Sequence, residues 1–274
     1  PHGYFKNFSH QIKRSSVLIL HKFFLNFTNL IIIPSKQTKA TLVKSFPIIK
    51  KRDVICIPNG VNIEVFNPPT KREKIILKNE YGIPLKNKVL LYAGLLEERK
   101  NVKLLVKAFS LLLKNTKRVN LILTYHTPVF PDQMKYKLSL EKISLSENIN
   151  NRITWIENPK KIADIYKISD IFILPSRQDN SPLVFTESLA TKLIFLGTPV
   201  GTVKEILPKI DTRLTIKSKN PQKLARQLLY ILNLKNGERN KIIHKVYKLS
   251  KELTWSNISL IIYKNLSSRT SSQS

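Results

Sequence analysis

The sequence is poor in cysteine, glycine and acidic residues, and each shortage limits what the protein can be. Cys56 is the one cysteine among 274 residues, so the chain can form no internal disulfide, and this fits a reducing compartment. Seven glycines leave few positions where the backbone can turn tightly or approach a ligand closely. Carboxylates are also scarce, with 18 acidic residues against 47 basic ones, so each acidic residue in a motif is a stronger candidate for a site.

The excess of basic residues gives a formal net charge of +29, and it is unevenly distributed. Residues 1–52 contain ten Lys or Arg residues and no Asp or Glu. Partners rich in phosphate fit this charge: an anionic membrane surface, a lipid diphosphate or a nucleic acid. The alternative is codon usage in an AT-rich genome, which would raise the Lys content without selecting a partner. Nucleic acid is the least favoured partner, because no nucleic-acid motif is present and aromatic residues are not interleaved with basic ones.

The apolar segment from Val17 to Ile33 approaches the length of a membrane span. His21, Lys22 and two asparagines interrupt it, so we expect a helix followed by a short buried strand, Leu30–Ile33. We therefore expect a cytoplasmic protein, and the charge leaves open a peripheral contact with the inner membrane surface.

From about Lys88 onward, short apolar runs alternate with helical patterns. Five runs are expected to be buried strands: Val89–Tyr92, Val119–Leu123, Ile153–Ile156, Ile171–Leu174 and Leu193–Leu196. Helices are expected between them, for example over Leu104–Leu113 and Ile162–Ile168. This alternation predicts an α/β fold with a doubly wound parallel sheet. Three amphipathic helices are expected over residues 220–266, and a disordered tail over residues 267–274.

The most informative motif follows the run Ile171–Leu174. It contains two carboxylates, Asp179 and Glu187, with seven residues between them. Asn180 or Ser181 is expected to cap the helix that follows, with Pro182 in its first turn. Asp179 would then lie in the loop at the carboxyl end of a strand, and Glu187 more than one turn inside the helix. Parallel sheets bind phosphates and sugars at this edge.

Residues 175–190 resemble the donor site of retaining glycosyltransferases with the GT-B fold, glycosyltransferase family 4, also called glycosyl transferases group 1. Five further segments resemble the family in the expected order, so that the similarity covers roughly residues 29–266. They are Ile57–Asn62 with Phe66 and Pro68 (the interdomain hinge), Tyr92–Phe109 (the diphosphate-binding loop and its helix), Tyr166–Asp170, Thr198–Ile206 (the loop after the next strand) and Leu253–Trp255 (the start of the final helix).

The resemblance implies two Rossmann-like domains, of which 274 residues hold one complete domain and part of another. The N-terminal domain would be partial, since Pro1–Tyr4 resembles a segment from the middle of the family's N-terminal half. The expected division is a partial N-terminal, acceptor-side domain (1–61), a hinge and connection (62–86), the C-terminal nucleotide-sugar donor domain (87–252), a terminal helix returning toward the N-terminal domain (253–266) and the tail (267–274).

The chemistry of the family gives roles to particular residues. A nucleoside diphosphate leaves the anomeric carbon while the acceptor hydroxyl attacks from the same face, so positive charge must gather at the diphosphate. By resemblance, Lys100 supplies that charge, and Gly94 lets the backbone approach the phosphates. Glu187 matches the carboxylate that binds the ribose hydroxyls. Asp179 matches the one that contacts the transferred sugar.

Further donor contacts are implied by the same resemblance. Backbone amides of Asn180, Ser181, Leu183 and Val184 are expected to complete the phosphate cradle. His2 matches a histidine of the N-terminal domain that reaches the donor sugar. Ordinary structural alternatives remain open: Lys100 as a solvated surface lysine, Asp179 as a helix cap, and His2 as a residue near a chain end.

The chain departs from the family at several positions. Leu95 stands where the family has an arginine, which removes one of two cations expected at the diphosphate. Three further differences replace glycine or proline. Thr124-Tyr125 stands where the family has a glycine, and Thr202 replaces the second glycine of a later loop. Thr191-Lys192 and Ile194 stand where the family usually has Cys-Gly and then a proline. We expect the fold to tolerate these changes, whereas turnover is in doubt.

We therefore expect a hexosyltransferase-type glycosyltransferase that uses a nucleotide-diphosphate sugar and a sugar or lipid-linked hydroxyl acceptor, with no metal or other cofactor. Polysaccharide or glycolipid synthesis is the expected context. A degenerate, non-catalytic GT-B protein that binds nucleotide or a partner enzyme is an alternative, favoured by Leu95 and the missing glycines. A basic membrane- or nucleic-acid-binding module is another, favoured by charge alone. Activity of this chain by itself is doubtful, because the family holds the acceptor with its N-terminal domain.

Overall fold

The computed structural model describes residues 23–24 and 27–270 and divides the chain into two compact units, Pro1–Ile57 and Pro58–Ser274. The units divide after Ile57, whereas the sequence placed the end of the N-terminal domain at residue 61. The assignment of acceptor and donor domains to the two parts stays a prediction. Among the residues described, no helix combines the length and the apolar character needed to cross a membrane.

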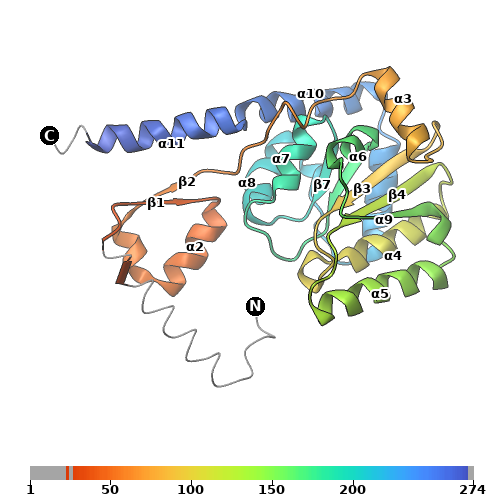
Figure 1. Ribbon diagram of the computed structural model, residues 1–274, viewed down its shortest axis with the longest axis horizontal. Coiled ribbons are helices and arrows are strands. Elements are labelled where there is room, and N and C mark those ends of the chain that lie inside the picture. The colour runs from red at the N-terminus through yellow and green to blue at the C-terminus, as the bar shows by residue number, and fades with distance from the viewer. Residues whose placement is uncertain (1–22, 25–26, 271–274) are drawn as a thin grey trace. The chain divides into compact units, whose positions relative to one another are not determined.

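The first unit contains a two-stranded parallel sheet (Figure 1). Strand β1 (Leu30–Ile33) pairs with β2 (Asp53–Cys56), and the helix α2 (Lys36–Ser45) and the 3-10 helix η1 (Pro47–Lys51) connect them. Helix α2 begins at Ser35, whose hydroxyl accepts a hydrogen bond from the backbone amide of Thr38 at 3.1 Å. The strand predicted over Leu30–Ile33 is present, but the expectation that it is buried holds for Ile33 and not for Ile32, which is 41% exposed. Most of the helix predicted before it lies outside the described residues.

The second unit is built on a five-stranded parallel sheet with the order β5-β4-β3-β6-β7. The strands are β3 (Lys88–Ala93), β4 (Val119–Tyr125), β5 (Ile153–Glu157), β6 (Ile171–Leu174) and β7 (Ile194–Gly197). All five predicted strands are therefore present, although β4 continues to Tyr125 and β7 is shifted by one residue. Every residue of β4, β6 and β7 is buried, as expected for a parallel sheet covered on both faces.

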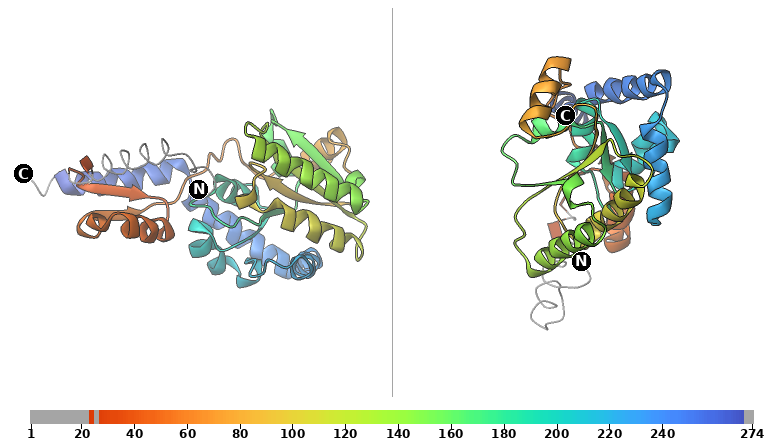
Figure 2. Two further views of the ribbon diagram at one scale, coloured as in Figure 1. Left: turned by 90° about the horizontal axis from the view of Figure 1, so that it is seen from below. Right: turned by 90° about the vertical axis from the view of Figure 1, so that its right-hand side faces the viewer.

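Helices cover both faces of this sheet (Figure 1, Figure 2). Helices α4, α5 and α9 pack together on one face, while α6 and α7, with α3 and α10 against them, cover the other. The helices of the unit are α3 (Lys71–Glu80), α4 (Val102–Leu113), α5 (Pro131–Ser146), α6 (Ile162–Ile168), α7 (Leu183–Ala190), α8 (Gly201–Ile210), α9 (Pro221–Leu232), α10 (Asn236–Glu252) and α11 (Trp255–Thr270), and the short 3-10 turns are η2 (Glu98–Lys100), η3 (Asn150–Arg152) and η4 (Thr212–Leu214).

The strand order reverses between β3 and β6. From β3 the chain moves outward through β4 to β5, then returns to β6 on the other side of β3 and continues to β7. The doubly wound topology predicted from the sequence is thus confirmed. In such sheets the loops after the two central strands turn to opposite sides, and ligands bind between them. The loops after β3 and β6 are the ones that carry the predicted site residues.

Two sequence expectations differ from the structure outside the site. The tail expected from residue 267 is wrong up to residue 270, because α11 continues to Thr270. The stretch 62–86, expected as hinge and connection, contains the ten-residue helix α3. A capping box explains its start: the Thr70 hydroxyl accepts from the Glu73 amide, and the Glu73 carboxylate accepts from the Thr70 amide.

Lys192 shows how the chain accommodates one of the departures noted in the sequence. The family has glycine at this position, and Lys192 takes a left-handed backbone conformation with φ of 60°. Glycine adopts this conformation at little cost, whereas a side chain adds strain. The Lys192 ammonium lies 4.3 Å from the centre of the Tyr247 ring on α10, an interaction that offsets part of the strain.

Candidate active site

The loops that follow β3 and β6 lie side by side at the switch point of the sheet. The backbone amide of Arg177 donates to the carbonyl of Arg99 at 2.7 Å, and the Asn101 side-chain amide donates to the carbonyl of Pro175 at 3.2 Å. Asn101 is buried and has a left-handed backbone (φ 54°), which ends η2 and starts α4. These bonds hold the side chains of the two loops in a fixed relation.

Lys100 and Asp179 meet between these loops. The Lys100 ammonium donates to Asp179 Oδ2 at 2.7 Å, and the two side chains are only 14% and 13% exposed. Shielding of this degree makes the pair stronger than an ordinary surface ion pair. The structure therefore brings together two of the residues predicted from the sequence, and neither is a solvated surface side chain.

Gly94 begins the loop after β3 in a conformation that favours glycine. Its φ is 147°, and its amide donates to the carbonyl of Thr124 at the end of β4. The buried Tyr92 hydroxyl donates to the carbonyl of Leu95 at 2.7 Å and so fixes the next residue as well. The loop thus presents its backbone at the edge of the sheet, and Leu95 contributes no cation to it.

Helix α7 starts one or two residues later than the sequence predicted. Pro182 is its N-cap residue and no side chain caps the helix, so the expected capping by Asn180 or Ser181 is wrong. Ser181 is held elsewhere: its hydroxyl accepts from the Asn59 amide at 3.1 Å, and its carbonyl accepts from the Asn59 side chain at 2.7 Å. Within residues 23–24 and 27–270, no side chain therefore accepts a hydrogen bond from the amides of Leu183 and Val184 in the first turn of α7.

The N-terminus of α8 supports the same loop from the other side. Gly201 has φ of 47°, and a Cβ atom there would lie 1.8 Å from the Asn180 carbonyl oxygen. The Thr202 amide donates to that oxygen at 3.0 Å. Gly201 was not predicted as a site residue, although its sequence signal was available: it is one of seven glycines and follows directly on β7 and its loop.

Glu187 lies one turn into α7 and accepts a hydrogen bond from the Tyr166 hydroxyl at 2.7 Å. Burial raises the pKa of the Glu187 carboxyl above its usual value, and the bond from Tyr166 offsets part of that rise. Tyr166 is fully buried and stacks on Phe172 of β6. In the part of the chain that the structure describes, no hydrogen bond or ion pair joins Glu187 to Lys100 or Asp179.

A second polar cluster follows β4 and β5 at the same edge of the sheet. The Thr127 hydroxyl donates to Glu157 Oε1 at 2.5 Å, and the Asn158 side chain donates to the Thr127 hydroxyl at 2.6 Å. Asn158 has a left-handed backbone with φ of 46°. Sequence analysis missed this cluster because its residues come from two strands and share no motif.

Two other expectations concern His2 and metal ions. His2 lies outside the described residues. Within residues 23–24 and 27–270, no three His, Cys, Asp or Glu side chains are grouped so that they could hold a metal ion.

Comparison with known proteins gives relatives whose sequences match about two thirds of this chain. The chain is 24% identical over 189 residues to N-acetyl-alpha-D-glucosaminyl L-malate synthase of Bacillus anthracis, a match that covers 69% of this chain and 47% of that protein. It is 28% identical over 191 residues to alpha-monoglucosyldiacylglycerol synthase of Streptococcus pneumoniae, covering 69% of this chain and 40% of the relative. The chain thus spans less than half the length of either protein.

The fold also matches solved structures. Anabaena Alr3699/HepE, determined in complex with UDP and glucose, superposes with a TM-score of 0.77 at 16% identity, over 92% of this chain and 67% of that one. This likeness establishes a GT-B-type fold. Residues 73–249, well over half of the chain, match the family described as glycosyl transferases group 1, and the chain therefore belongs to that family.

Proposed function

We propose that this chain carries the donor site of a glycosyltransferase that transfers a sugar from a nucleotide-diphosphate sugar, with retention, to a sugar or lipid-linked hydroxyl. The observation that carries the proposal is the shielded pair of Lys100 and Asp179 at the switch point, next to the uncapped first turn of α7. A cation and free amides at one place suit a diphosphate. The complex of a structural neighbour with UDP and glucose supports a nucleotide-sugar donor, and the names of the two relatives, which make a glucosaminyl and a glucosyl conjugate, support sugar transfer.

In the proposed complex the diphosphate competes with Asp179 for the Lys100 ammonium. The phosphates lie between Lys100, the backbone at Gly94 and the amides of Leu183 and Val184, and no metal or other cofactor takes part. Lys100 then stabilises the negative charge that develops as the diphosphate leaves. Asp179, released from the pair, accepts hydrogen bonds from hydroxyls of the transferred sugar, and Glu187 accepts them from the ribose.

Binding of nucleoside diphosphates tests this arrangement. Lys100→Ala should weaken binding of UDP, GDP or ADP, whichever binds most tightly, by about 10- to 100-fold, the usual effect of losing one charged hydrogen bond. Asp179→Asn should strengthen it by about threefold or more, because a carboxylate no longer faces the diphosphate. Isothermal titration calorimetry measures both effects. Lys107→Ala, at an exposed position on α4, is the matched control and should leave the affinity unchanged.

The outcomes separate the residue assignment from the function. If none of the three nucleotides binds the unaltered chain, the donor-site proposal is wrong. If one binds and Lys100→Ala affects it no more than Lys107→Ala, the site lies elsewhere. A degenerate protein is the second candidate, favoured by Leu95, which supplies no cation at the position where the family has an arginine. It would bind nucleotide with the predicted response to mutation, yet hydrolyse or transfer no donor sugar in any full-length context.

A further inference from the structure

A cavity of about 410 Å³ lies at the opposite edge of the sheet, between α3 and the amino end of β3. We call it the lysine cavity. Five lysines and one carboxylate are its charged lining residues: Lys71, Lys74, Lys78, Lys86, Lys88 and Asp170. Strand β3 has six residues and separates this cavity from the donor loops by roughly 20 Å along its length. The lysine cavity is therefore distinct from the site at Lys100 and Asp179.

Both oxygens of the single carboxylate, that of Asp170, already contact groups of the protein. Asp170 Oδ1 lies 3.2 Å from the Lys74 ammonium and 3.6 Å from that of Lys88, and Oδ2 accepts from the Val89 amide at 2.9 Å. Burial acts to raise the pKa of Asp170, but the attraction of Lys74, Lys88 and Lys78, together with the hydrogen bond from the Val89 amide, holds the pKa below its usual value. The Asp170 carboxylate is thus negatively charged and interacts with two lysines, Lys74 and Lys88.

Lys78 shows that this one anion does not balance the lysines. Its side chain is only 5% exposed, and its ammonium donates to two neutral acceptors, the carbonyls of Leu85 at 3.2 Å and Asn87 at 2.6 Å. Burial lowers the pKa of Lys78, and repulsion from Lys74 and Lys88 lowers it further, against the attraction of Asp170. An additional anion in the cavity would relieve this repulsion.

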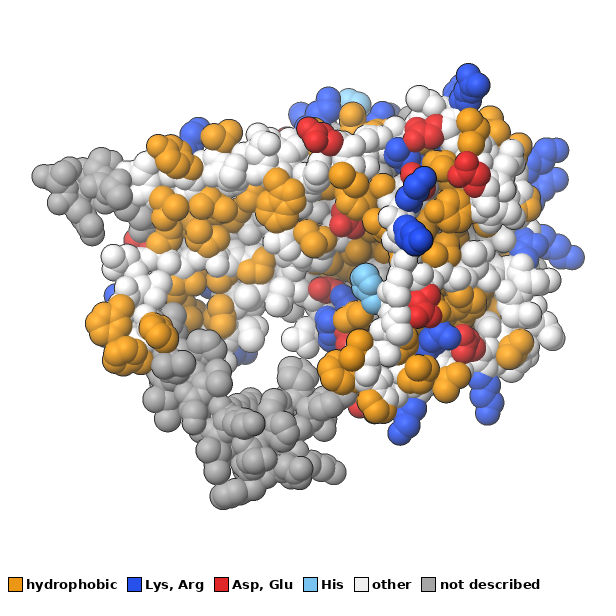
Figure 3. All heavy atoms as spheres, in the orientation of Figure 1, with side chains coloured by type: hydrophobic (Ala, Val, Ile, Leu, Met, Phe, Trp, Pro, Cys, Tyr) orange, Lys and Arg blue, Asp and Glu red, His pale blue; other side chains and the backbone are white. Residues whose placement is uncertain are grey.

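We propose that the lysine cavity binds a phosphate group. Five lysines and one carboxylate line the cavity, and a phosphate monoester or diphosphate brings the additional negative charge in a compact form with several acceptor oxygens. Lys71 and Lys86 are exposed at the rim, where they can reach a ligand from solvent. Figure 3 shows Lys and Arg side chains along the end of the second unit that carries α3. That field attracts anions to the cavity.

Two apolar side chains also line the cavity. Ile75 and Leu85 are 48% and 51% exposed, respectively. They suit a phosphate attached to an apolar or sugar group, as in a lipid headgroup or a soluble phosphate ester, and the shared feature is the phosphate.

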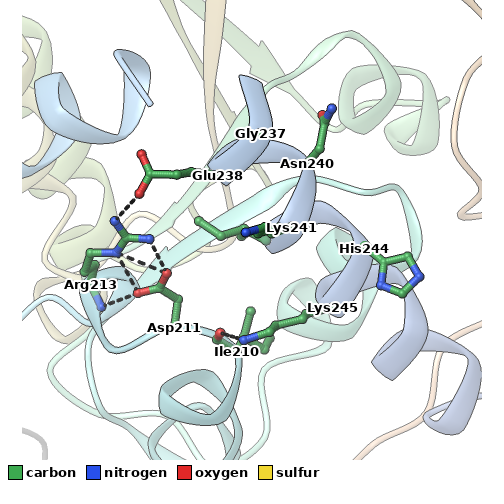
Figure 4. Close-up of a pocket in the computed structure, with 10 residues that line it drawn as sticks. Ile210, Asp211, Arg213, Gly237, Glu238, Asn240, Lys241, His244 and Lys245 are labelled. Carbon is green, nitrogen blue, oxygen red and sulfur yellow. Dashed lines mark hydrogen bonds and ion pairs between the residues drawn. The ribbon is translucent and has the colours of Figure 1, made fainter. Parts of the chain in front are cut away.

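A larger cavity, about 620 Å³, lies between the end of α8 and α10 and has a different character. Figure 4 shows Arg213 held between Asp211 and Glu238, with Lys245 directed to the carbonyl of Ile210. The guanidinium makes ion pairs with both carboxylates, and with Lys241 and Lys245 the lining holds three cations against two carboxylates, which is close to a balance. The lysine cavity lacks such a balance, and this is why we assign the anion to it.

Methyl NMR of Ile75 and Leu85 reports binding in the lysine cavity itself, separately from the donor site. Inorganic phosphate should shift these resonances saturably. In Lys71→Gln/Lys86→Gln the dissociation constant should rise about tenfold or more, since two cations are lost. The control variant Lys107→Gln/Lys248→Gln removes the same charge from exposed positions on α4 and α10. It should change the dissociation constant less than about twofold, because distant exposed charges are screened. Asp170→Asn should lower the dissociation constant; if this variant does not fold, the lysine variants decide.

Vesicle flotation identifies the source of the phosphate. If the lysine cavity holds a lipid headgroup, Lys71→Gln/Lys86→Gln should lose binding to vesicles that contain phosphatidic acid, whose headgroup is a phosphate monoester, and should lose more of it than the control double variant does. Neither variant should bind vesicles of phosphatidylcholine alone. If vesicle binding of the two variants is equal while the NMR response is lost in the first alone, the ligand is a soluble phosphate. Absence of a saturable shift at Ile75 and Leu85, or equal weakening in both double variants, would overturn the proposal.

Discussion

Glu187 is a buried carboxyl in a position where charge is costly. Its pKa is raised by burial, and Tyr166 is the one side chain among the described residues that donates a hydrogen bond to it. A carboxyl whose pKa rises on folding binds more protons in the folded than in the unfolded chain. Its contribution to stability therefore falls as pH rises from the ordinary carboxyl range through the raised pKa, and stays low above it. We therefore expect the charged carboxyl of Glu187 to lower stability at neutral pH, as the proposed role in ribose binding allows.

Glu187→Gln tests that inference. The neutral amide can still accept the hydrogen bond from Tyr166. The free energy of unfolding of the variant near pH 7 should therefore exceed that of the parent by on the order of 1 kcal/mol. Near pH 4, where the native carboxyl is protonated, the two proteins should be equally stable. Denaturant unfolding at both pH values measures this. A variant that is less stable than the parent at pH 7 would show that the carboxylate is stabilising.

Removal of the hydroxyl in Tyr166→Phe should have the opposite effect. Glu187 would lose the bond that stabilises its charged form, so its pKa should rise further and the free energy of unfolding at pH 7 should fall by about 1 to 2 kcal/mol. NMR titration of the Glu187 carboxyl carbon checks the pKa directly. An unchanged titration curve would mean that the hydroxyl does not act on the carboxylate in solution.

Among the site residues, Lys100 and Asp179 could be predicted to lie together because each follows a central strand of one parallel sheet. Tyr166 could not be predicted as the partner of Glu187. It precedes β6 by several residues, and only the packing of α6 against the sheet brings its hydroxyl to α7. Asn59 was recognised as part of the hinge, but its bonds to Ser181 span 122 positions of sequence.

At the scale of elements, Asn101 connects the start of α4 to the end of β6. Its left-handed backbone suits Asn or Gly, and its side-chain amide donates a hydrogen bond to the buried carbonyl of Pro175. Asn101→Ala should cost about 2 to 3 kcal/mol, since it combines backbone strain with a lost hydrogen bond. Asn101→Gly relieves the strain and should cost about 1 kcal/mol. Thermal unfolding measures both, and equal losses would show that the backbone conformation is not what the position requires.

The same substitutions should affect the donor site through Lys100. Because Asn101 follows Lys100 directly, loss of its bond frees the loop after β3, and nucleotide affinity should fall in both variants by about threefold to tenfold. Unchanged affinity in a destabilised Asn101→Gly variant would show that the Lys100–Asp179 pair alone positions the loop.

The five strands of the second unit could be predicted from the sequence to within two residues, because apolar runs such as Ile171–Leu174 suit a strand that is buried on both faces. Helix α3 could not be predicted in this way, because its polar sequence was read as part of the hinge and connection. The start of α7 could not. Serine often caps helices, yet Ser181 accepts two hydrogen bonds from Asn59 instead. Which of the two partners it takes depends on tertiary structure. Local preference is overridden where a long-range partner is available.

For the molecule as a whole, the question is whether the net charge of +29 or the local site determines nucleotide binding. Raising the ionic strength from about 0.1 M to 1 M shortens the Debye length from about 10 Å to 3 Å, which screens the field of distant lysines but acts much less on a shielded contact. Lys100 is 14% exposed. Affinity for the nucleoside diphosphate should therefore fall with salt in every variant, while the ratio between the parent and Lys100→Ala should persist.

Calorimetric titrations at both ionic strengths give this ratio. Lys107→Ala again serves as the control, because it removes the same charge from an exposed helix position and should match the parent at high salt. If the effect of Lys100→Ala vanishes at 1 M salt, Lys100 acts only as one more cation in a basic protein. The chain would then bind nucleotide as it would any polyanion, and the basic-module hypothesis would replace a specific donor site. If the ratio persists, nucleotide recognition belongs to the switch-point loops, and the net charge only concentrates anions around them.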